Sequence, residues 1–445
     1  MNNIFVNFDR IVGKIKPFHG INNAPIIGGN TALYHYLGDA GIPYSRLHDT
    51  GGALGGGRFV DIENIFRDFD ADVTNPDSYD FAFTDWLLEQ ITAQGTDIIF
   101  RLGATIENAH RIKAYHIFPP KNCMKWAQIC EGIIRHYNHG WANGYHYDIK
   151  YWEIWNEPDN EPEIKDNPMW KGTKEQYFEL YEVTSNYLKE RFPYIKIGGY
   201  ASCGFYALTN DFVKNAHSSP RTGYFIDFFH EFMQYISSEE HRSPLDFFSW
   251  HSYADSSSNS LWAKYVREQL DKYGFFNTES MLNEWNPGIQ RRGTEEDACY
   301  ILEMMLKLHK APLDILTYYD GQVHGNYQGL FNPVKLDVFP AYYALHSYNE
   351  LYTLKNEVLV NAENENIVVL AASDGKIGRI LFVNIDEDVL KVRIDTANTW
   401  RLTKYKILDG ANGLAESKLS DSDSFVIPSF KIALVEYINE NHNTK

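Results

Sequence analysis

Two glutamates lie where the chain can bring a pair of carboxyl groups together. Glu157 ends the segment Trp152-Glu153-Ile154-Trp155-Asn156-Glu157, and Glu284 lies in Leu282-Asn283-Glu284-Trp285-Asn286. Both follow strand-like runs and have Trp and Asn nearby in sequence. Cleavage of a glycosidic bond needs two carboxyl groups, one that protonates the leaving oxygen and one that attacks the sugar or activates water. Taken together, the two positions favour this chemistry over two unrelated solvated side chains.

Both glutamates belong to a pattern that alternates strand-like runs with helical stretches. The strand-like runs are Ile15–Asn22, Tyr44–His48, Asp97–Leu102, Tyr151–Asn156, Lys196–Tyr200, Phe247–Tyr253, Ser280–Trp285 and Ile315–Tyr319. The helical stretches include Asp85–Gln94, Asn122–Tyr137, Lys174–Arg191, Glu295–Lys310 and Ala341–Leu351. This alternation predicts a parallel sheet, and the number of runs favours a closed (β/α)₈ TIM barrel over an open doubly wound sheet. Glu157 and Glu284 would then lie at the carboxyl end of the strands, where barrels carry catalytic side chains.

The hydrophobic pattern of the sequence changes from about Lys355. Short strand-like runs follow one another, and Leu390, Val392 and Ile394 alternate with charged residues. The period of two predicts antiparallel strands, and turn formers separate the runs. The opening Ile4–Val12 is also strand-like and is expected to pair with them. We therefore predict a catalytic barrel over residues 15–352 and an accessory antiparallel β-sandwich from residues 1–14 and 353–445.

The charge balance excludes some classes of partner. The 445 residues include 41 Lys and Arg against 59 Asp and Glu, a formal net charge of −18. Nucleic acids and anionic membrane surfaces are bound by clustered basic residues, so neither is an expected partner. The 10 Trp, 30 Tyr and 27 Phe are an excess of aromatic rings that fits a carbohydrate or glycoside ligand. Oligomeric state is not indicated by any of these features.

The opening residues and the hydropathy bear on compartment. The start of the chain lacks a basic region followed by an apolar one, and no run reaches the length of a membrane span. We expect a cytoplasmic protein, or a periplasmic or secreted one if a leader has been removed. The four cysteines contain no C-x-x-C pair, which argues against a zinc ribbon or a thioredoxin-type site.

Other chemistries are less well supported. The glycine run Gly51–Gly57 lacks the ending of a P-loop, and Asp70–Asp80 lacks the glycine and glutamate of an EF-hand. His136 and His139 have no evident third metal ligand. We therefore expect no cofactor and no catalytic metal.

The segment Tyr151–Asp159 (YWEIWNEPD) resembles the acid/base strand of glycoside hydrolase family 39. Further likenesses cover residues 20–350 and are specific as a set. They include Tyr79-Asp80-Phe81, Pro119-Pro120-Lys121, Gln176-Tyr177-Phe178, Ile197-Gly198-Gly199, Ser249–Tyr253 and Asn283–Asn286. The resemblance implies a retaining enzyme with a barrel, a β-sandwich and a double-displacement mechanism.

The same resemblance implies roles for particular residues. Glu157 would be the general acid/base and Glu284 the nucleophile that forms a covalent glycosyl-enzyme intermediate. The implied substrate-binding residues are Asn156, which would contact the sugar 2-hydroxyl, and His48, Arg46, His251, Tyr253 and Trp285. To play these parts, Glu157 should have a raised pKa, and hydrogen bonds should keep Glu284 ionised. A bend is also required, since strict alternation would point Asn156 and Glu157 to opposite faces.

The identity of the sugar stays open. Terminal β-xylosides are the first expectation, and α-L-iduronides or arabinose-containing glycans are also compatible with the family. A uronide would require a basic group at the mouth, for which Arg46, Arg58, Arg291 and Arg292 are candidates. The segment Thr317-Tyr318-Tyr319-Asp320 lacks the Trp expected on the last strand, and Asp320 could be a binding or a structural residue. The alternatives of another class are an inverting hydrolase and a non-catalytic carbohydrate-binding barrel.

Overall fold

The computed structural model describes residues 1–50, 60–105, 116–209, 220–323, 327–418 and 423–442. Within these ranges, eight parallel strands close a barrel in chain order, and the first strand pairs with the last. They are β2 (Gly20–Asn22), β3 (Tyr44–Leu47), β4 (Asp97–Leu102), β5 (Tyr151–Ile154), β6 (Lys196–Ser202), β7 (Phe247–Ser252), β8 (Glu279–Trp285) and β9 (Ile315–Tyr318). The predicted TIM barrel is confirmed.

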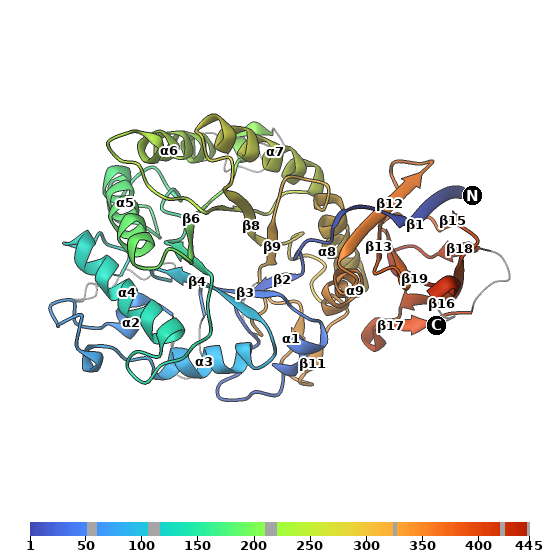
Figure 1. Cartoon of the computed structure of the whole chain (residues 1–445), viewed down its shortest axis with the longest axis horizontal. Coiled ribbons are helices and arrows are strands. Elements are labelled where there is room, and N and C mark those ends of the chain that lie inside the picture. Colours follow the sequence, from blue (N-terminus) through green and yellow to red (C-terminus); the bar gives the residue numbers. More distant parts are fainter. Residues whose placement is uncertain (51–59, 106–115, 210–219, 324–326, 419–422, 443–445) are drawn as a thin grey trace.

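Helices surround this barrel on its outer face, as Figure 1 shows. They are α1 (His35–Asp39), α2 (Ile62–Ile65), α3 (Ala82–Thr92), α4 (Cys123–His139), α5 (Lys174–Arg191), α6 (Pro220–Ser237), α7 (Ser256–Lys272), α8 (Glu295–Leu308) and α9 (Tyr342–Tyr352). Capping side chains begin several of them: the Asn122 side chain accepts from the Lys125 N–H, and Thr173 and Gln176 form a capping box at α5. These caps explain why α4 and α5 begin close to where their sequence patterns begin.

Nine further strands of the described residues form one continuous sheet beside the barrel. Its order is β17-β16-β19-β14-β13-β12-β1-β15-β18, nine strands within the described residues. The bounds are β1 (Asn2–Lys14), β12 (Asn356–Ala362), β13 (Val368–Ser373), β14 (Ile377–Asn384), β15 (Leu390–Asp395), β16 (Trp400–Leu408), β17 (Leu414–Glu416), β18 (Ser424–Ile427) and β19 (Lys431–Asn439). As expected, the start of the chain joins this sheet, where β1 pairs with β12 and β15. The β1–β15 pair is parallel, so the sheet is mixed and not purely antiparallel.

The sheet is attached to the barrel through α8 and α9. Glu295 at the start of α8 accepts from Lys431 of β19, with 2.6 Å between Nζ and Oε2. Arg379 of β14 pairs with Glu350 of α9 at 2.7 Å. The sheet also has its own apolar core, which is separate from the large core between barrel and helices. The exact limits of the two domains stay a prediction.

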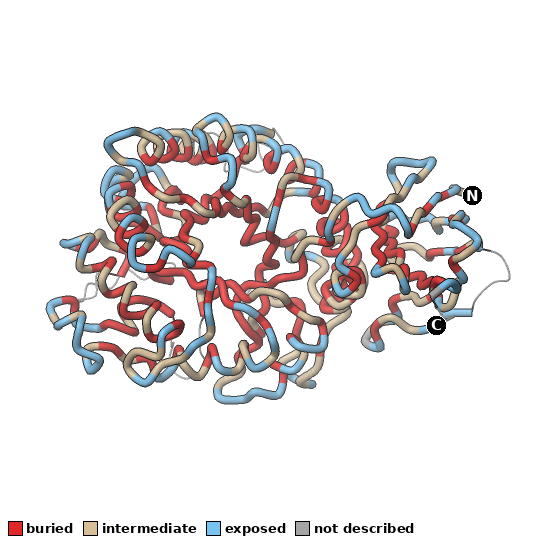
Figure 2. The backbone as a smooth tube through the Cα atoms, in the orientation of Figure 1, coloured by how far each residue is buried: buried red, intermediate tan, exposed pale blue. Residues whose placement is uncertain are grey.

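Burial follows this layering, and the strands of the barrel are almost wholly buried in Figure 2. Two strands of two residues each, β10 (Phe331–Asn332) and β11 (Asp337–Val338), pair with each other and lie between β9 and α9 in the chain. Short 3₁₀ turns occur at Pro76–Ser78, Tyr206–Leu208, Gly410–Asn412 and Glu440–His442. Among the helices of the described residues, none has the length and apolar character needed to cross a membrane.

Candidate active site

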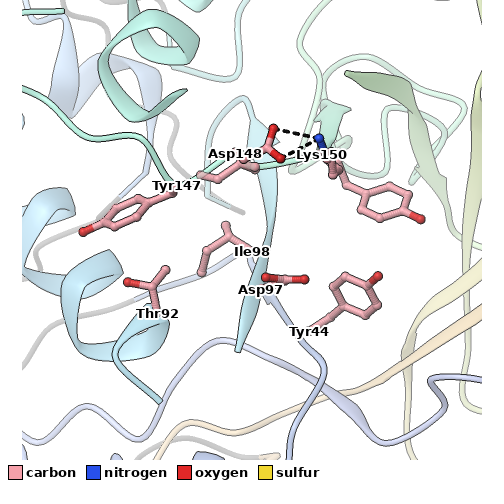
Figure 3. Close-up of a pocket in the computed structure, with 9 residues that line it drawn as sticks. Tyr44, Thr92, Asp97, Ile98, Tyr147, Asp148 and Lys150 are labelled. Atoms are coloured by element: carbon pink, nitrogen blue, oxygen red, sulfur yellow. Dashed lines mark hydrogen bonds and ion pairs between the residues drawn. The ribbon is translucent and has the colours of Figure 1, made fainter. Parts of the chain in front are cut away.

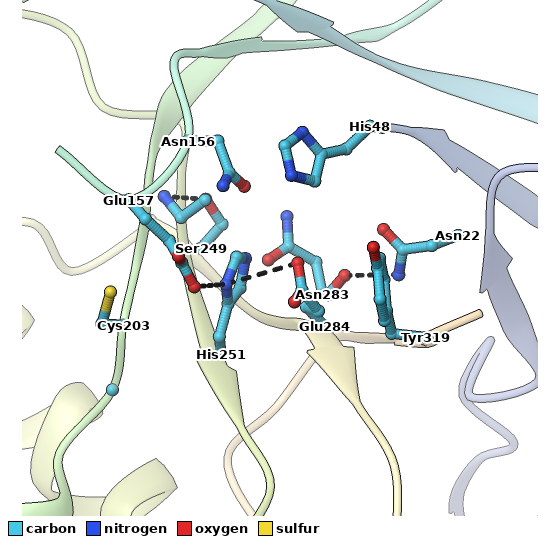
Figure 4. A network of polar contacts seen from close by, with 12 residues as sticks. Asn22, His48, Asn156, Glu157, Cys203, Ser249, His251, Asn283, Glu284 and Tyr319 are labelled. Carbon is cyan, nitrogen blue, oxygen red and sulfur yellow. Dashed lines mark hydrogen bonds and ion pairs between the residues drawn. The ribbon is translucent and has the colours of Figure 1, made fainter. Parts of the chain in front are cut away.

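Glu157 and Glu284 meet at the carboxyl end of the barrel strands, with His251 of β7 between them (Figure 4). The Nδ1 atom of His251 lies 2.7 Å from Oε1 of Glu157 and 3.4 Å from Oε2 of Glu284. One oxygen of each carboxylate and a ring nitrogen of His251 all lie within 4.8 Å of one another. The fold therefore brings the two predicted acids into one site, although 127 residues separate them in the sequence (284 minus 157).

The backbone after β5 turns sharply, and this turn places Glu157. Strand β5 ends at Ile154, and both Trp155 and Glu157 have positive φ, of 73° and 46°. Such angles are uncommon for residues other than glycine. They break the strand alternation, so that Asn156 reaches Arg46 while Glu157 reaches His251. This turn is the bend that the sequence required.

An extra residue in β8 places Glu284. Trp250 of β7 pairs with Leu282, but the next residue, His251, pairs with Glu284. The pairing with β9 is shifted in the same stretch, between Leu282 and Trp285. A bulge of this kind re-aims side chains at a strand end. It lets the consecutive residues Asn283 and Glu284 both contact partners in the site.

Arg46 of β3 is the fully buried cation beneath the two acids, and four side chains contact it. Its Nε donates to Oε2 of Glu153 at 2.8 Å, and its Nη2 donates to Oδ1 of Asn156 at 2.6 Å. Its Nη1 contacts Oδ1 of Asn22 at 3.1 Å and Oε2 of Glu284 at 3.4 Å. Burial opposes the charge of Arg46, but Glu153 and Glu284 outweigh burial and raise its pKa. Since its donors are taken up in this way, Arg46 links the acid-bearing strands β5 and β8.

The electrostatics of Glu157 differ from the expectation. Burial would raise the pKa of Glu157, but hydrogen bonds from His251 and Asn160 outweigh burial, and the pKa is lowered. Burial would likewise lower the pKa of His251, but the charges of Glu284 and Glu157 raise it. The prediction of a raised pKa at Glu157 is therefore wrong for this structure. The physical reason is that the proton of this pair is better stabilised on the imidazole, between two carboxylates.

Tyr253 contacts the second acid. Its hydroxyl donates to Oε1 of Glu284 at 2.5 Å, and its backbone N–H donates to the hydroxyl of Tyr206. Gly204 has a φ of 108° and lies close to β7. A Cβ added to Gly204 would be 2.5 Å from the carbonyl oxygen of His251 in that strand. A glycine is required there because both the backbone angle and the space exclude a side chain.

A second group of polar side chains lies on the His48 side of the site (Figure 4). Nε2 of His48 lies 3.3 Å from Oδ2 of Asp49, to which the Tyr319 hydroxyl also donates at 3.2 Å. Nδ1 of His48 is buried and has no hydrogen-bond partner among the described residues. Asp320 accepts from Gln322 at 2.8 Å, and burial raises its pKa to about 7. His48 thus keeps one ring nitrogen available for a ligand.

Trp285 is the predicted site residue that the structure places elsewhere. Its side chain is 0% exposed, and its ring packs edge-on against Tyr318 within the large apolar core. A ring in this position offers no free face to a sugar, so we leave Trp285 out of the proposed site. Trp285 directly follows Glu284 in β8, and successive side chains of a strand point to opposite faces, so its ring points away from the acids.

Sequence reasoning missed several residues that support the acids: Asn22, Glu153, Asn160 and Asn283. Glu153 could have been found from the sequence. It lies two residues after Tyr151 on the same strand and therefore points to the same face, and Tyr151 belongs to the small apolar cluster of the barrel interior. An acid on the inward face of a barrel strand needs a buried cation, and Arg46 supplies it. Asn22, Asn160 and Asn283 carry no comparable signal.

A small pocket at the opposite end of the barrel is not the site. It has a volume of about 40 Å³ and includes Tyr44, Asp97 and Tyr151, the first residues of β3, β4 and β5 (Figure 3). An ion pair of Asp148 and Lys150 borders it, at 2.7 Å. Barrel enzymes carry their chemistry at the other, carboxyl end of the strands.

The site residues also bear on metal binding. Among the described residues, Glu157, His251 and Glu284 form the group with a spacing that would admit a metal ion. Nδ1 of His251 and Oε1 of Glu157 already form a hydrogen bond with each other at 2.7 Å. The expected absence of a catalytic metal stays a prediction.

The chain resembles known carbohydrate-active proteins. Residues 48–295 match the sequence family described as Glycosyl hydrolases family 39. A beta-xylosidase of Geobacillus stearothermophilus is 24% identical over 225 residues, which make up 49% of this chain and 39% of that protein. The matched region thus spans less than half of that relative. The family match reaches from the end of β3 to the start of α8 and includes both predicted acids.

Solved structures share the fold over almost the whole chain. A glucosidase from Croceicoccus marinus superposes with a TM-score of 0.77 at 19% identity, covering 99% of each chain. A monomeric beta-xylosidase from Caulobacter crescentus superposes with a TM-score of 0.69 at 16% identity, covering 99% of this chain and 100% of that one. At these identities the likeness shows a common architecture of barrel and attached sheet.

Proposed function

Because this chain belongs to glycosyl hydrolase family 39 and so has a carbohydrate substrate, we propose that it is a retaining, exo-acting glycosidase of the β-xylosidase type. The observation that carries the proposal is the close approach of the two acids, with one oxygen from each within 4.8 Å of the other. Retaining enzymes separate their carboxyl groups by about 5–5.5 Å, and inverting enzymes by about 6.5–9.5 Å. The spacing therefore favours retention over inversion.

In the first step, Glu284 attacks the anomeric carbon while Glu157 protonates the leaving oxygen. The Tyr253 hydroxyl and the Arg46 guanidinium both donate to the Glu284 carboxylate, and these contacts hold it in place. The 2.7 Å contact between His251 and Glu157 holds the proton that Glu157 delivers. In the second step, Glu157 takes a proton from water, which attacks the glycosyl–Glu284 ester and releases the sugar with its original anomeric configuration.

Asn156 is oriented for a sugar hydroxyl. Its Oδ1 accepts a hydrogen bond from Arg46 at 2.6 Å, and a guanidinium can only donate. The amide nitrogen of Asn156 is therefore turned away from Arg46 and can donate to the sugar 2-hydroxyl. Hydrogen bonds to this hydroxyl strengthen in the transition state of glycoside hydrolysis.

The charges around the site favour a neutral sugar over an iduronide. Arg46 is surrounded by its protein partners, Arg291 pairs with Glu296, and Arg292 contacts Tyr318 and Asp297. Arg58 lies outside the described residues. On the His48 side, the carboxylate of Asp49 lies 3.3 Å from Nε2 of His48, and an acidic side chain there disfavours the carboxylate of a uronate. We therefore propose a neutral glycone, and arabinose-containing glycans remain compatible.

A trapping experiment tests the proposal. The wild-type protein is incubated with a panel of 2,4-dinitrophenyl glycosides, then with the 2-deoxy-2-fluoro analogue of any glycoside it cleaves. We expect a burst of dinitrophenol and a glycosylated peptide that contains Glu284. Release of the opposite anomer, followed by NMR, would show inversion. Failure to cleave any member of the panel would favour a non-catalytic carbohydrate-binding barrel.

A further inference from the structure

On the basis of the proposed function, we propose that Asn160 and Arg221 form a positioning pair that orients the carboxylate of Glu157 and stabilises its ionised form. Asn160 lies three residues after Glu157 in the loop that follows β5. Arg221 comes from the first turn of α6, 61 residues further along the chain. The pair thus ties the loop of the acid/base to a helix on the outside of the barrel.

The contacts form a chain from Arg221 to the acid. Nε of Arg221 donates to the backbone oxygen of Asn160 at 2.7 Å, and Nη2 donates to Oδ1 of the same residue at 2.9 Å. Nδ2 of Asn160 then donates to Oε2 of Glu157 at 2.7 Å. The backbone N–H of Asn160 also donates to the Glu157 carbonyl, at 3.1 Å. Asn160 is 7% exposed, so water competes little for these bonds.

Arg221 decides which way the Asn160 amide points. An amide side chain can be turned by 180° with little change of shape, and its orientation follows from its partners. A guanidinium has only donors, so the atom that faces Arg221 must be the amide oxygen. The amide nitrogen is then directed at Glu157 as a donor. Without Arg221, the Asn160 side chain would lose this constraint and could present its oxygen to the carboxylate.

The donated hydrogen bond matters most in the second half of the reaction. Glu157 must be ionised to accept a proton from the attacking water, and a hydrogen bond to a carboxylate stabilises that form. The two carboxylate oxygens have different partners, since Oε1 contacts His251 and Oε2 contacts Asn160. Two fixed partners hold the carboxyl plane in one orientation. Asn160 and Arg221 act through Glu157 and do not need to contact the substrate.

Several other titratable groups face Glu157, and any pH profile includes their effects. They include His251 and Glu284 from β7 and β8, His48 from the end of β3, Cys203 from the end of β6, Asp159 from the loop of Glu157 itself, and the hydroxyls of Tyr206, Tyr253 and Tyr327. A comparison of variants that change only Asn160 or Arg221 leaves all of these in place.

The test compares Asn160→Ala, Asn160→Asp and Arg221→Met with the matched control Arg191→Met. Arg191 resembles Arg221, because each guanidinium pairs with a glutamate and lies over an aromatic ring, but Arg191 is at the end of α5. Substrates with a dinitrophenyl leaving group make the second step limiting. For these, Asn160→Ala and Arg221→Met should lower kcat about tenfold, the loss expected for one hydrogen bond to a charged group. With an alkyl glycoside, whose leaving group must be protonated by Glu157, the alkaline limb of kcat/KM should move to higher pH, and further in Asn160→Asp, where a like charge is added.

A second readout does not depend on activity. The Glu157 carboxyl can be titrated by NMR in protein with ¹³C-labelled glutamate, and its midpoint should rise in the order wild type, Arg221→Met, Asn160→Ala, Asn160→Asp. Unchanged midpoints and pH profiles in folded Asn160 variants would overturn the proposal. If Arg221→Met did not fold, Arg221→Lys, which retains one donor, should show a smaller rise than Asn160→Ala. If the wild type cleaved no glycoside, the proposed function would fail while the titration still reported on the pair.

Discussion

The imidazole of His251 lies 2.7 Å from the carboxylate of Glu157, and this contact sets the protonation of the site. The pKa of His251 is raised and that of Glu157 is lowered, so the pair holds its proton mainly on the imidazole. A general acid must nevertheless donate a proton to the leaving oxygen. The short contact resolves this conflict, because the proton can return to Glu157 when the substrate displaces water and burial favours the neutral acid.

Replacing His251 by Asn should therefore raise the pKa of Glu157. A raised pKa keeps Glu157 protonated to higher pH, so the alkaline limb of kcat/KM should move upward. We also expect kcat to fall at least about tenfold, since a neutral amide replaces the positively charged imidazole beside Glu157. His230→Asn is the control, because the two ring nitrogens of His230 contact the hydroxyls of Tyr265 on α7 and of Tyr273 directly after α7. An alkaline limb that stayed in place would contradict the assigned role.

Replacing Glu157 by Ala should separate substrates by their leaving group. Dinitrophenolate departs without protonation, so its glycosides should still form the intermediate, whereas alkyl glycosides should not react. Added azide should then restore turnover of the activated substrates by replacing water, and the product should be a glycosyl azide. Glu284→Ala should abolish turnover of both substrate types. Full activity of Glu157→Ala on alkyl glycosides would contradict the assignment of the acid/base.

Replacing Glu153 by Gln should destabilise the fold as well as the site. Glu153 and Arg46 are both 0% exposed and lie 2.7 Å apart, so the variant leaves a buried guanidinium without its main counter-charge. Removal of one partner of a buried ion pair costs about 3–5 kcal/mol. Denaturant unfolding measures this loss. Glu190→Gln, whose side chain is 82% exposed, should change the free energy of unfolding by less than about 0.5 kcal/mol.

Replacing Asp320 by Asn should stabilise the protein in a way that depends on pH. Burial raises the pKa of Asp320 from 3.8 to about 7, so the folded state binds its proton more tightly than the unfolded state. This group therefore costs stability as pH rises from about 4 to about 7. The gain from Asp320→Asn should be small at pH 4 and largest above pH 7, with an upper limit of about 4 kcal/mol. Thermal unfolding at a series of pH values measures it, and a gain independent of pH would contradict the buried acid.

The site should discriminate against a charged sugar. Aryl β-xylosides should be cleaved with a kcat/KM at least about 100-fold above that of aryl α-L-iduronides, because Arg46, Arg291 and Arg292 are already paired with acidic side chains and the carboxylate of Asp49 lies beside His48. Asp49→Asn should reduce the ratio of kcat/KM for the xyloside to that for the iduronide, because it removes the negative charge beside His48. A preference for the iduronide would point instead to a basic residue such as Arg58.

The predicted order of elements was largely right, since all eight barrel strands and the helix Lys174–Arg191 lie where the sequence pattern placed them. Such elements can be predicted because period and capping are local properties of the chain. The mixed pairing of β1 could not be predicted, because its parallel partner β15 lies almost 400 residues away. The lowered pKa of Glu157 was missed for a similar reason, since it depends on His251 from another strand.

Local pattern alone thus determines that this chain alternates strands and helices, and that Glu157 and Glu284 lie at the ends of two different strands. The residue types around them indicate glycoside chemistry. The distances between side chains are settled only by the tertiary structure. The positive φ angles at Trp155 and Glu157 and the bulge in β8 shift the alternation by one residue, which turns both acids into the same space. Burial of Arg46 and the placement of Arg221 depend on strands and a helix that meet only when the barrel closes. Pairing register and charge burial are properties of the whole fold, and no local window of sequence contains them.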